Sequence, residues 1–429
     1  MPLSKSLSMM VERLIRLATG LAFVIIAARY LEPEAFGLVA FSQTVVLMLN
    51  SLAGLGMETQ LPRMLLRRRN QRNVLLSALL PRIFTGVFAI CLLLLVVLAL
   101  DLPESGTIAI MAPILLFGTF SLYEQVLLAG FRQDRIALIR LSVGLPFFAL
   151  KCAAIIATGD IRWIAAAIML ESVASFLVTR RFALRLTGPE RGPLPRARAV
   201  KVLLRRSLPL ALAGSTLMLF AYTDQILLRW FRGPAEVGEY VLGIRFTEAW
   251  ISLVAAFALA MTPAIIRDHD ATRGRAGDAR MLRFSMEIAV AGSVLYLLLC
   301  LALAPWALRA LVGDKLEGAR AVAQIYCLVA PLAAMRLVSG KWFIAQNLNR
   351  ALARRAAMGL VINVAVGLVL IPWLGGIGAA ISTVIAYIFV GLLADLLHPA
   401  SRNVVAVKLA AILPRNSLRY VGRWWTQDH

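Results

Sequence analysis

Long apolar stretches recur along almost the whole chain, and each is long enough to cross a lipid bilayer as a helix. A spanning helix needs about 20 mostly apolar residues, so a chain of 429 residues has room for about twelve. Hydrophobic residues make up 60% of the sequence and charged residues only 16%, which excludes a water-soluble globular protein of this size. The sequence therefore predicts an all-α polytopic membrane protein, with spans near residues 9–29, 38–58, 74–100, 108–130, 136–158, 163–179, 207–229, 239–263, 282–308, 320–343, 355–372 and 377–397.

Basic residues gather in every second connection between these spans, for example Arg67 to Arg69, Arg132 with Arg135, and Arg180 to Arg206. The other connections, which alternate with these, are nearly free of basic residues. Since Lys and Arg are retained on the cytoplasmic side, this alternation predicts a cytoplasmic (inner) membrane protein with both termini in the cytoplasm. The first apolar stretch lacks a small-residue cleavage site, so we expect it to be retained as a helix. The net charge of +22 then reflects orientation and lipid contacts, and no nucleic-acid-binding pattern accompanies it.

A polar segment near the midpoint separates two groups of six predicted spans. We expect an N-terminal six-helix bundle over residues 1–180, a basic cytoplasmic linker over 181–206, a C-terminal six-helix bundle over 207–397 and a basic cytoplasmic tail over 398–429. Six spans in each half would make an internal duplication parallel, about an axis along the membrane normal. Four residues recur at one common offset, which favours such a duplication: Pro33, Gly37, Pro62 and Arg82 recur as Pro234, Gly238, Pro263 and Arg283.

Several kinds of chemistry are disfavoured by what the sequence lacks. It has no G-x-x-x-x-G-K-[ST] motif, so it does not hydrolyse nucleotides through a P-loop. The four cysteines lie within apolar stretches without C-x-x-C spacing, and the three histidines are far apart in the sequence. We therefore expect no catalytic residues, no cofactor and no metal site.

Ionisable side chains within the predicted spans are the informative positions, because a charge in the bilayer normally faces a wet cavity or a partner helix. Guanidinium groups bind phosphate well, so the basic residues are candidates for holding an anionic head group in a central cavity. The alternative is ion pairing between helices, and the sequence leaves both open. The basic candidates are Arg82, Lys151, Arg245, Arg336, Arg13 and Arg16, of which the last two could instead reach the cytoplasmic surface. The acidic candidates for ion coupling or pairing are Asp224, Glu248, Glu124 and Glu171, with Glu287 as a further acidic partner.

Three stretches resemble the polysaccharide-transporter branch of the multidrug/oligosaccharidyl-lipid/polysaccharide (MOP) exporter superfamily, which contains Wzx-type O-antigen flippases. The first begins at Ala28-Arg-Tyr-Leu-Glu-Pro-Glu-Ala-Phe-Gly-Leu and continues to Leu55-Gly-Met-Glu-Thr-Gln-Leu-Pro-Arg. The second comprises Leu208-Pro-Leu-Ala-Leu, Tyr222-Thr-Asp-Gln-Ile-Leu-Leu and Val237-Gly-Glu-Tyr, and the third runs from Asn363 to Thr383. Their order and spacing extend the resemblance over nearly the whole chain.

The resemblance implies a MATE-like fold, in which two six-helix bundles surround a central cavity with alternating access. It also implies a bacterial flippase that moves undecaprenyl-diphosphate-linked oligosaccharide from the inner to the outer leaflet for O-antigen, capsule or exopolysaccharide synthesis. Asp224 and Gln225 match the family pattern of the seventh helix, whereas Arg82, Arg245 and Arg336 are candidates by their depth alone. The expected partners are the lipid-linked oligosaccharide, membrane lipids and the polysaccharide polymerase machinery.

Two competing functions stay open from the sequence. A cation-coupled multidrug exporter of the same fold would have an acidic and aromatic cavity, whereas the basic residues here favour an anion. An integral-membrane glycan polymerase or ligase is disfavoured by the short outer connections. The resemblance to lipid II flippases is incomplete because the chain lacks two further C-terminal spans.

Overall fold

The computed structural model describes residues 3–67, 71–100, 103–130, 132–187, 195, 197–272, 279–313, 315–346, 348–397 and 402–412, and their regular structure is helical. Contacts between Cα atoms divide the chain into two units, Met1–Tyr222 and Thr223–His429. The division falls within one long helix, and part of the predicted linker, residues 188–194 and 196, lies outside the described residues.

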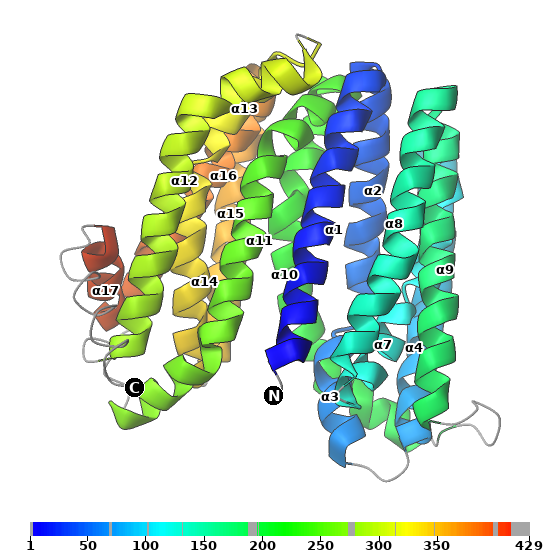
Figure 1. Ribbon diagram of the computed structural model, residues 1–429, viewed down its shortest axis with the longest axis vertical. Helices are drawn as coiled ribbons and strands as arrows, with labels where there is room; N and C mark the ends of the chain where they lie inside the picture. Colours follow the sequence, from blue (N-terminus) through cyan, green and yellow to red (C-terminus); the bar gives the residue numbers. More distant parts are fainter. Residues whose placement is uncertain are drawn as a thin grey trace. The chain divides into compact units, whose positions relative to one another are not determined.

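The first unit consists of long helices joined by short connections (Figure 1). In chain order they are α1 (Leu3–Tyr30), α2 (Pro33–Ala53), α3 (Met57–Arg67), α4 (Gln71–Leu100), α5 (Ser105–Met111), α6 (Ile114–Phe117), α7 (Phe120–Ala129), α8 (Gln133–Thr158), α9 (Ile161–Thr187) and most of α10 (Ala197–Arg232). Within it, α8 packs against both α1 and α9, and α7 packs against α9 and α3.

The second unit begins within α10 and continues through α11 (Pro234–Ala271), α12 (Arg280–Val312), α13 (Gly318–Tyr326), α14 (Val329–Ala345), α15 (Asn349–Leu374), α16 (Gly376–Gly391), the 3-10 segment η1 (Leu393–Leu397) and α17 (Arg402–Ile412). Its largest buried apolar cluster joins α11, α12 and α14 with α17. Small residues permit the closest helix approaches: a Cβ added at Gly378 would lie 2.5 Å from the Leu370 carbonyl oxygen, so α15 and α16 meet there without a side chain between them.

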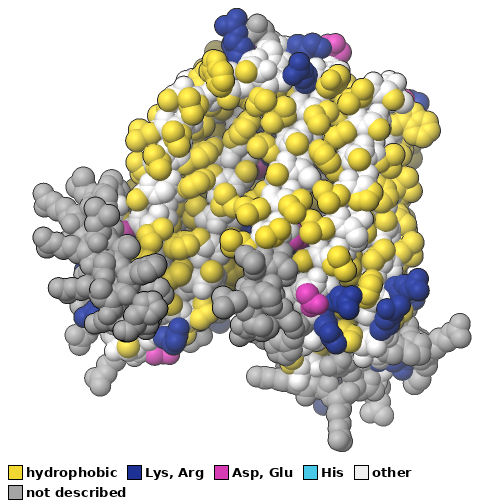
Figure 2. Space-filling view, in the orientation of Figure 1, with side chains coloured by type: hydrophobic (Ala, Val, Ile, Leu, Met, Phe, Trp, Pro, Cys, Tyr) yellow, Lys and Arg dark blue, Asp and Glu magenta, His cyan; other side chains and the backbone are white. Residues whose placement is uncertain are grey.

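Every predicted span coincides with a helix or a run of helices in the described residues. Nine of these segments are long and apolar enough to cross a membrane, or ten if α13 and α14, which meet at a 40° bend, form one span. α1 and α10 coincide with the predicted spans 9–29 and 207–229 but are not among these segments. The all-helical membrane fold is therefore confirmed, while the number twelve stays a prediction. Hydrophobic side chains cover the sides of the helices, and most of the visible charged side chains gather near their ends (Figure 2).

Two of the four repeated pairs occupy equivalent places in the two units, whereas Pro62 lies in the separate helix α3 and Pro263 lies within α11. α2 begins at Pro33 and α11 begins at Pro234, where a residue without an N–H costs no helical hydrogen bond. Gly37 and Gly238, four residues later in each helix, are both buried. These equivalences agree with the predicted duplication.

Candidate functional site

A partly open cavity of about 400 Å³ lies within the first unit between α1, α7, α8 and α9. The residues of α1 that line it are three or four positions apart, from Glu12 to Phe23, so they share one face of the helix. The lining face of α8 runs from Ile139 to Lys151. The cavity therefore lies along two spans for more than two helical turns.

Four charged side chains form a continuous chain at one part of this cavity. Arg140 donates from Nε and Nη2 to the two carboxylate oxygens of Glu124, at 3.0 and 2.9 Å. Its Nη1 lies 3.8 Å from Oε1 of Glu12, which also accepts a 3.0 Å bond from Nε of Arg16. Glu12 is buried, whereas 55% of the Arg16 side chain is exposed. The two arginines and two carboxylates thus connect α1, α7 and α8.

A second ion pair borders the same cavity. Lys151 Nζ on α8 donates to Oε2 of Glu171 on α9 at 2.8 Å. The ammonium group also lies 5.2 Å from the centre of the Phe23 ring on α1, a cation–π distance. This pair joins three helices.

Four predicted candidates, Arg16, Lys151, Glu124 and Glu171, therefore come together in one cavity inside the first unit. The sequence left cavity lining and ion pairing as alternatives, and these side chains do both. Arg140 was not among the predicted residues, although an arginine within an expected span is the signal that identified the others.

Arg13 and Arg82 do not line this cavity. The Arg82 side chain is buried, with 1% of its surface exposed. The Arg82 guanidinium donates through Nη2 to the side-chain oxygen of Asn50 on α2. Arg82 therefore joins α4 to α2 in the interior of the first unit.

In the second unit, the carboxylate of Asp224 is surrounded by neutral donors. The Tyr240 hydroxyl donates to its Oδ2, Thr383 Oγ1 donates to the same oxygen at 3.4 Å, and the Gln225 N–H donates to Oδ1 at 2.8 Å. No basic side chain is recorded within ion-pair distance of Asp224 among the described residues. Hydroxyl groups from α11 and α16 thus take the place of a counter-cation.

The other predicted residues of the second unit are distributed among separate contacts. Arg245 Nη1 donates to Oε2 of Glu248 at 3.1 Å, in agreement with their spacing of three residues. The Arg336 guanidinium lies 5.4 Å from the centre of the Tyr387 ring. Glu287 is half-buried on α12.

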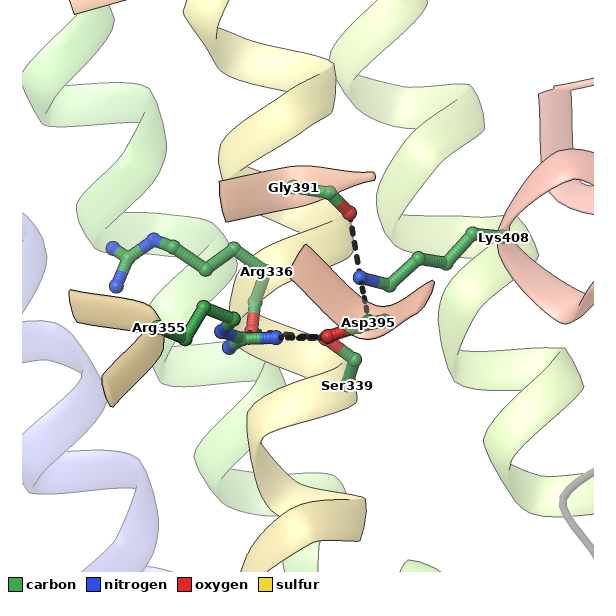
Figure 3. Close-up of polar contacts among 6 residues, drawn as sticks. All are labelled: Arg336, Ser339, Arg355, Gly391, Asp395 and Lys408. Carbon is green, nitrogen blue, oxygen red and sulfur yellow. Dashed lines mark hydrogen bonds and ion pairs between the residues drawn. The ribbon is translucent and has the colours of Figure 1, made fainter. Parts of the chain in front are cut away.

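A buried cluster near the end of the second unit was not predicted (Figure 3). Arg355 on α15 donates through Nη1 to Asp395 Oδ1 at 3.2 Å and to Ser339 Oγ at 3.1 Å, while its Nη2 donates to the Arg336 carbonyl oxygen at 3.0 Å. Lys408 on α17 donates to the other oxygen of Asp395 and to the Gly391 carbonyl. Burial lowers the pKa of Lys408 to about 8, and the neighbouring Asp395 carboxylate offsets only part of this effect. One carboxylate therefore holds two buried cations.

Among the described residues, no group of three or more His, Cys, Asp or Glu side chains is arranged to hold a metal ion. The charged side chains instead pair within and between helices. The side chains that line the described cavity offer a ligand charged groups, hydroxyls and aromatic rings.

Comparison with solved structures identifies the fold. An inward-facing multidrug-resistance MATE transporter of the MOP superfamily matches with 16% identity and a TM-score of 0.71, covering 91% of this chain and 95% of that one. The lipid II flippase MurJ in an inward closed conformation matches with 14% identity and a TM-score of 0.73, covering 99% of this chain and 93% of that one. The MATE transporter VcmN of Vibrio cholerae, studied as a variant, matches with 15% identity and a TM-score of 0.63 over 94% and 96% of the two chains.

Sequence comparison adds the family. A comparison with curated proteins gave no match. The family described as polysaccharide biosynthesis protein matches residues 4–269, which is more than half of the chain and extends from α1 to the end of α11. This match shows that the chain, which has the fold of MATE transporters and MurJ, is a multi-pass membrane protein of the polysaccharide biosynthesis protein family.

Proposed function

We propose that this protein is a flippase that moves undecaprenyl-diphosphate-linked oligosaccharide from the inner to the outer leaflet of the bacterial cytoplasmic membrane, with both termini in the cytoplasm. The observation that carries the proposal is the polysaccharide biosynthesis family match in a chain with a transporter fold. A chain with this fold and no P-loop can assist polysaccharide synthesis most directly by moving a lipid-linked precursor. The product would serve O-antigen, capsule or exopolysaccharide assembly, with a polymerase acting on it outside.

The charged cavity of the first unit supports a polar substrate. Charged side chains in a membrane protein are costly unless water, a partner or a ligand solvates them. Here Arg16, Arg140 and Lys151 border an open space of about 400 Å³ while remaining paired. A glycan would meet hydrogen-bonding groups there, while the lipid tail stays in the bilayer.

In this proposal the two six-helix bundles alternate in access around the substrate. Arg82, Arg245, Arg336 and Arg13 remain candidates for the diphosphate group. Asp224 and Glu248 remain candidates for coupling transport to an ion. The neutral donors around Asp224 support that role, since a carboxylate without a paired cation can accept a proton or a metal cation.

The multidrug exporter of the same fold is the competing function. Recognition of a cationic drug favours carboxylates that are free to face it. In the described cavity each carboxylate has a basic partner, because Glu12 and Glu124 contact Arg140 and Glu171 contacts Lys151. This pairing favours the glycan substrate.

The test is translocation of a fluorescently labelled undecaprenyl-diphosphate-linked glycan in vesicles that contain the purified protein. Wild-type protein should move the label to the opposite leaflet, and Arg82→Ala, Arg245→Ala, Arg336→Ala and Asp224→Asn should each be slower. Vesicles loaded with ethidium test the competing function. Ethidium efflux without glycan translocation would contradict the proposal.

A further inference from the structure

The described charges that line the cavity of the first unit sum to zero. Its three cations, Arg16, Arg140 and Lys151, face three carboxylates at 2.8–3.8 Å. A site built around a diphosphate would offer an excess of positive charge, because the bound group carries the balancing negative charge. The cavity lacks that excess, so its chemistry differs from that of a phosphate site.

Paired charges of this kind suit a ligand that donates and accepts hydrogen bonds at the same time. A carboxylate accepts through two oxygens, and a guanidinium donates from a planar fork beside it. A sugar hydroxyl does both, so neighbouring hydroxyls can bridge an Arg–Glu pair such as Arg140–Glu124. Ser121 on α7 and Ser175 on α9 add hydroxyls to the same lining.

Aromatic and small residues complete a surface suited to a sugar ring. Phe23 and Phe148 line the cavity from α1 and α8. An aromatic ring offers a flat apolar face, against which the C–H face of a pyranose can pack. Gly20 and Gly144 line it too, and a Cβ built at either meets no described atom within 4 Å outside its own helix neighbourhood. The space beside both glycines is therefore open.

We propose that this cavity is a sugar-binding subsite that holds the first sugars of the lipid-linked oligosaccharide, while the diphosphate is bound by other basic residues. The inference rests on the proposed function and assigns the glycan part of the substrate to α1, α7, α8 and α9. The volume of about 400 Å³ is at the lower end of small-molecule sites. It fits a mono- or disaccharide and excludes a complete long repeat unit.

The glycines permit a steric test. Gly144→Leu and Gly20→Leu add bulk to the cavity from two different helices, at positions where an added Cβ has open space, and Gly214→Leu is the matched control. Gly214 is also a helical glycine with open space around its Cβ, but it does not line the cavity. The probes are the oligosaccharide released by mild acid from the cell's own surface polysaccharide, and sugar-free undecaprenyl diphosphate. Binding of each probe is measured on the purified full-length protein by calorimetry.

The expected result is a selective loss of oligosaccharide binding. Gly144→Leu and Gly20→Leu should weaken oligosaccharide binding by about tenfold or more, and leave undecaprenyl diphosphate binding within about twofold of wild type. Gly214→Leu should bind both probes like wild type. Glu171→Gln provides a variant that adds no bulk. It should weaken oligosaccharide binding, because the amide removes one acceptor oxygen from the lining, and it should leave undecaprenyl diphosphate binding within about twofold of wild type.

Three results would overturn the subsite. They are equal losses for both probes, no loss for either probe, and failure of the wild-type protein to bind the oligosaccharide. Failure of the proposed function is separate, since it appears as wild-type vesicles that do not translocate the complete lipid-linked glycan. Wild-type translocation with no loss in the glycine variants would reject the subsite alone.

Discussion

Arg140 on α8 binds Glu124 on α7 through two parallel hydrogen bonds, and its third nitrogen, Nη1, lies 3.8 Å from Glu12 on α1. One guanidinium group thus connects three helices of the first unit. Since the planar fork of arginine matches the two oxygens of a carboxylate, lysine cannot reproduce this contact.

We therefore expect Arg140→Lys to lower the stability of the first unit by about 1–2 kcal/mol, because it retains the charge but loses the paired hydrogen bonds. This loss of stability is smaller than the loss expected for a fully buried ion pair, because 36% of the Arg140 side chain is exposed. Thermal unfolding of the purified protein in detergent measures the change. Arg135→Lys is the control, because the ion pair of Arg135 is a long one with its sequence neighbour: Arg135 Nε lies 3.9 Å from Asp134 Oδ2. Equal effects of the two substitutions would contradict the role of the fork.

In the proposed flippase, where Asp224 couples transport to an ion, Asp224→Asn should reduce transport about tenfold and make it independent of an ion gradient, while the protein stays folded. The amide keeps the size of the side chain but cannot carry the negative charge that the Tyr240 and Thr383 hydroxyls surround. Translocation rates with and without an imposed proton or sodium gradient measure the effect. Tyr240→Phe should weaken the gradient dependence to a smaller extent. A wild-type response to the gradient in Asp224→Asn would show that the carboxylate is not the coupling group.

Asp395→Asn should be much more harmful than Lys408→Met. The first substitution leaves the buried cations Arg355 and Lys408 without their shared carboxylate, and breaking such a contact costs about 3–5 kcal/mol. The second removes a buried charge but leaves the Arg355–Asp395 pair intact, so we expect a change of less than about 1 kcal/mol. Thermal unfolding and proteolysis near α17 distinguish the two variants. Similar losses in both would mean that Lys408 stabilises the cluster chiefly through its charge.

The packing of α17 against the second unit should become more stable as the pH rises from 8 to 10.5. The pKa of Lys408 falls from its ordinary value of 10.5 to about 8 in the folded protein. Below pH 8 the amine is charged in both the folded and unfolded states, so stability is constant. Between the two values the unfolded state binds more protons, and stability therefore rises with pH. Hydrogen exchange of α17 backbone amides measures this rise, which should be absent from Lys408→Met; a rise of equal size in that variant would assign the effect to other groups.

Apolar length and turn residues were sufficient to predict the helices. The lipid solvent requires a helix wherever the chain remains apolar for about 20 residues, and no packing detail is needed for that step. The starts were predicted less well, because α2 and α11 begin at Pro33 and Pro234, five residues before the predicted spans 38–58 and 239–263. Local spacing was also sufficient to predict that Arg245 and Glu248 can pair, because a separation of three residues along a helix brings two side chains to one face.

Contacts between helices could not be predicted in this way. Lys151 and Glu171 were identified separately, but their pairing depends on how α8 and α9 rotate about their axes. Arg140 and the Arg355–Asp395–Lys408 cluster depend on three elements each, which the periodicity of any single segment does not specify. The sequence therefore predicted four of the six charged residues that line the cavity, Arg16, Lys151, Glu124 and Glu171, but it did not predict Arg140 or which side chains pair.

The contact of Lys408 on α17 with Asp395 of η1 has a practical consequence for shortened versions of this protein. Ending the chain at Leu397 would remove the apolar side chains of α17 from the core of the second unit, together with one of the two cations bound to Asp395. A truncated protein that retains residues through Ile412 keeps both. Fusion partners and purification tags joined before Arg402 would therefore lose the contacts by which α17 binds the second unit.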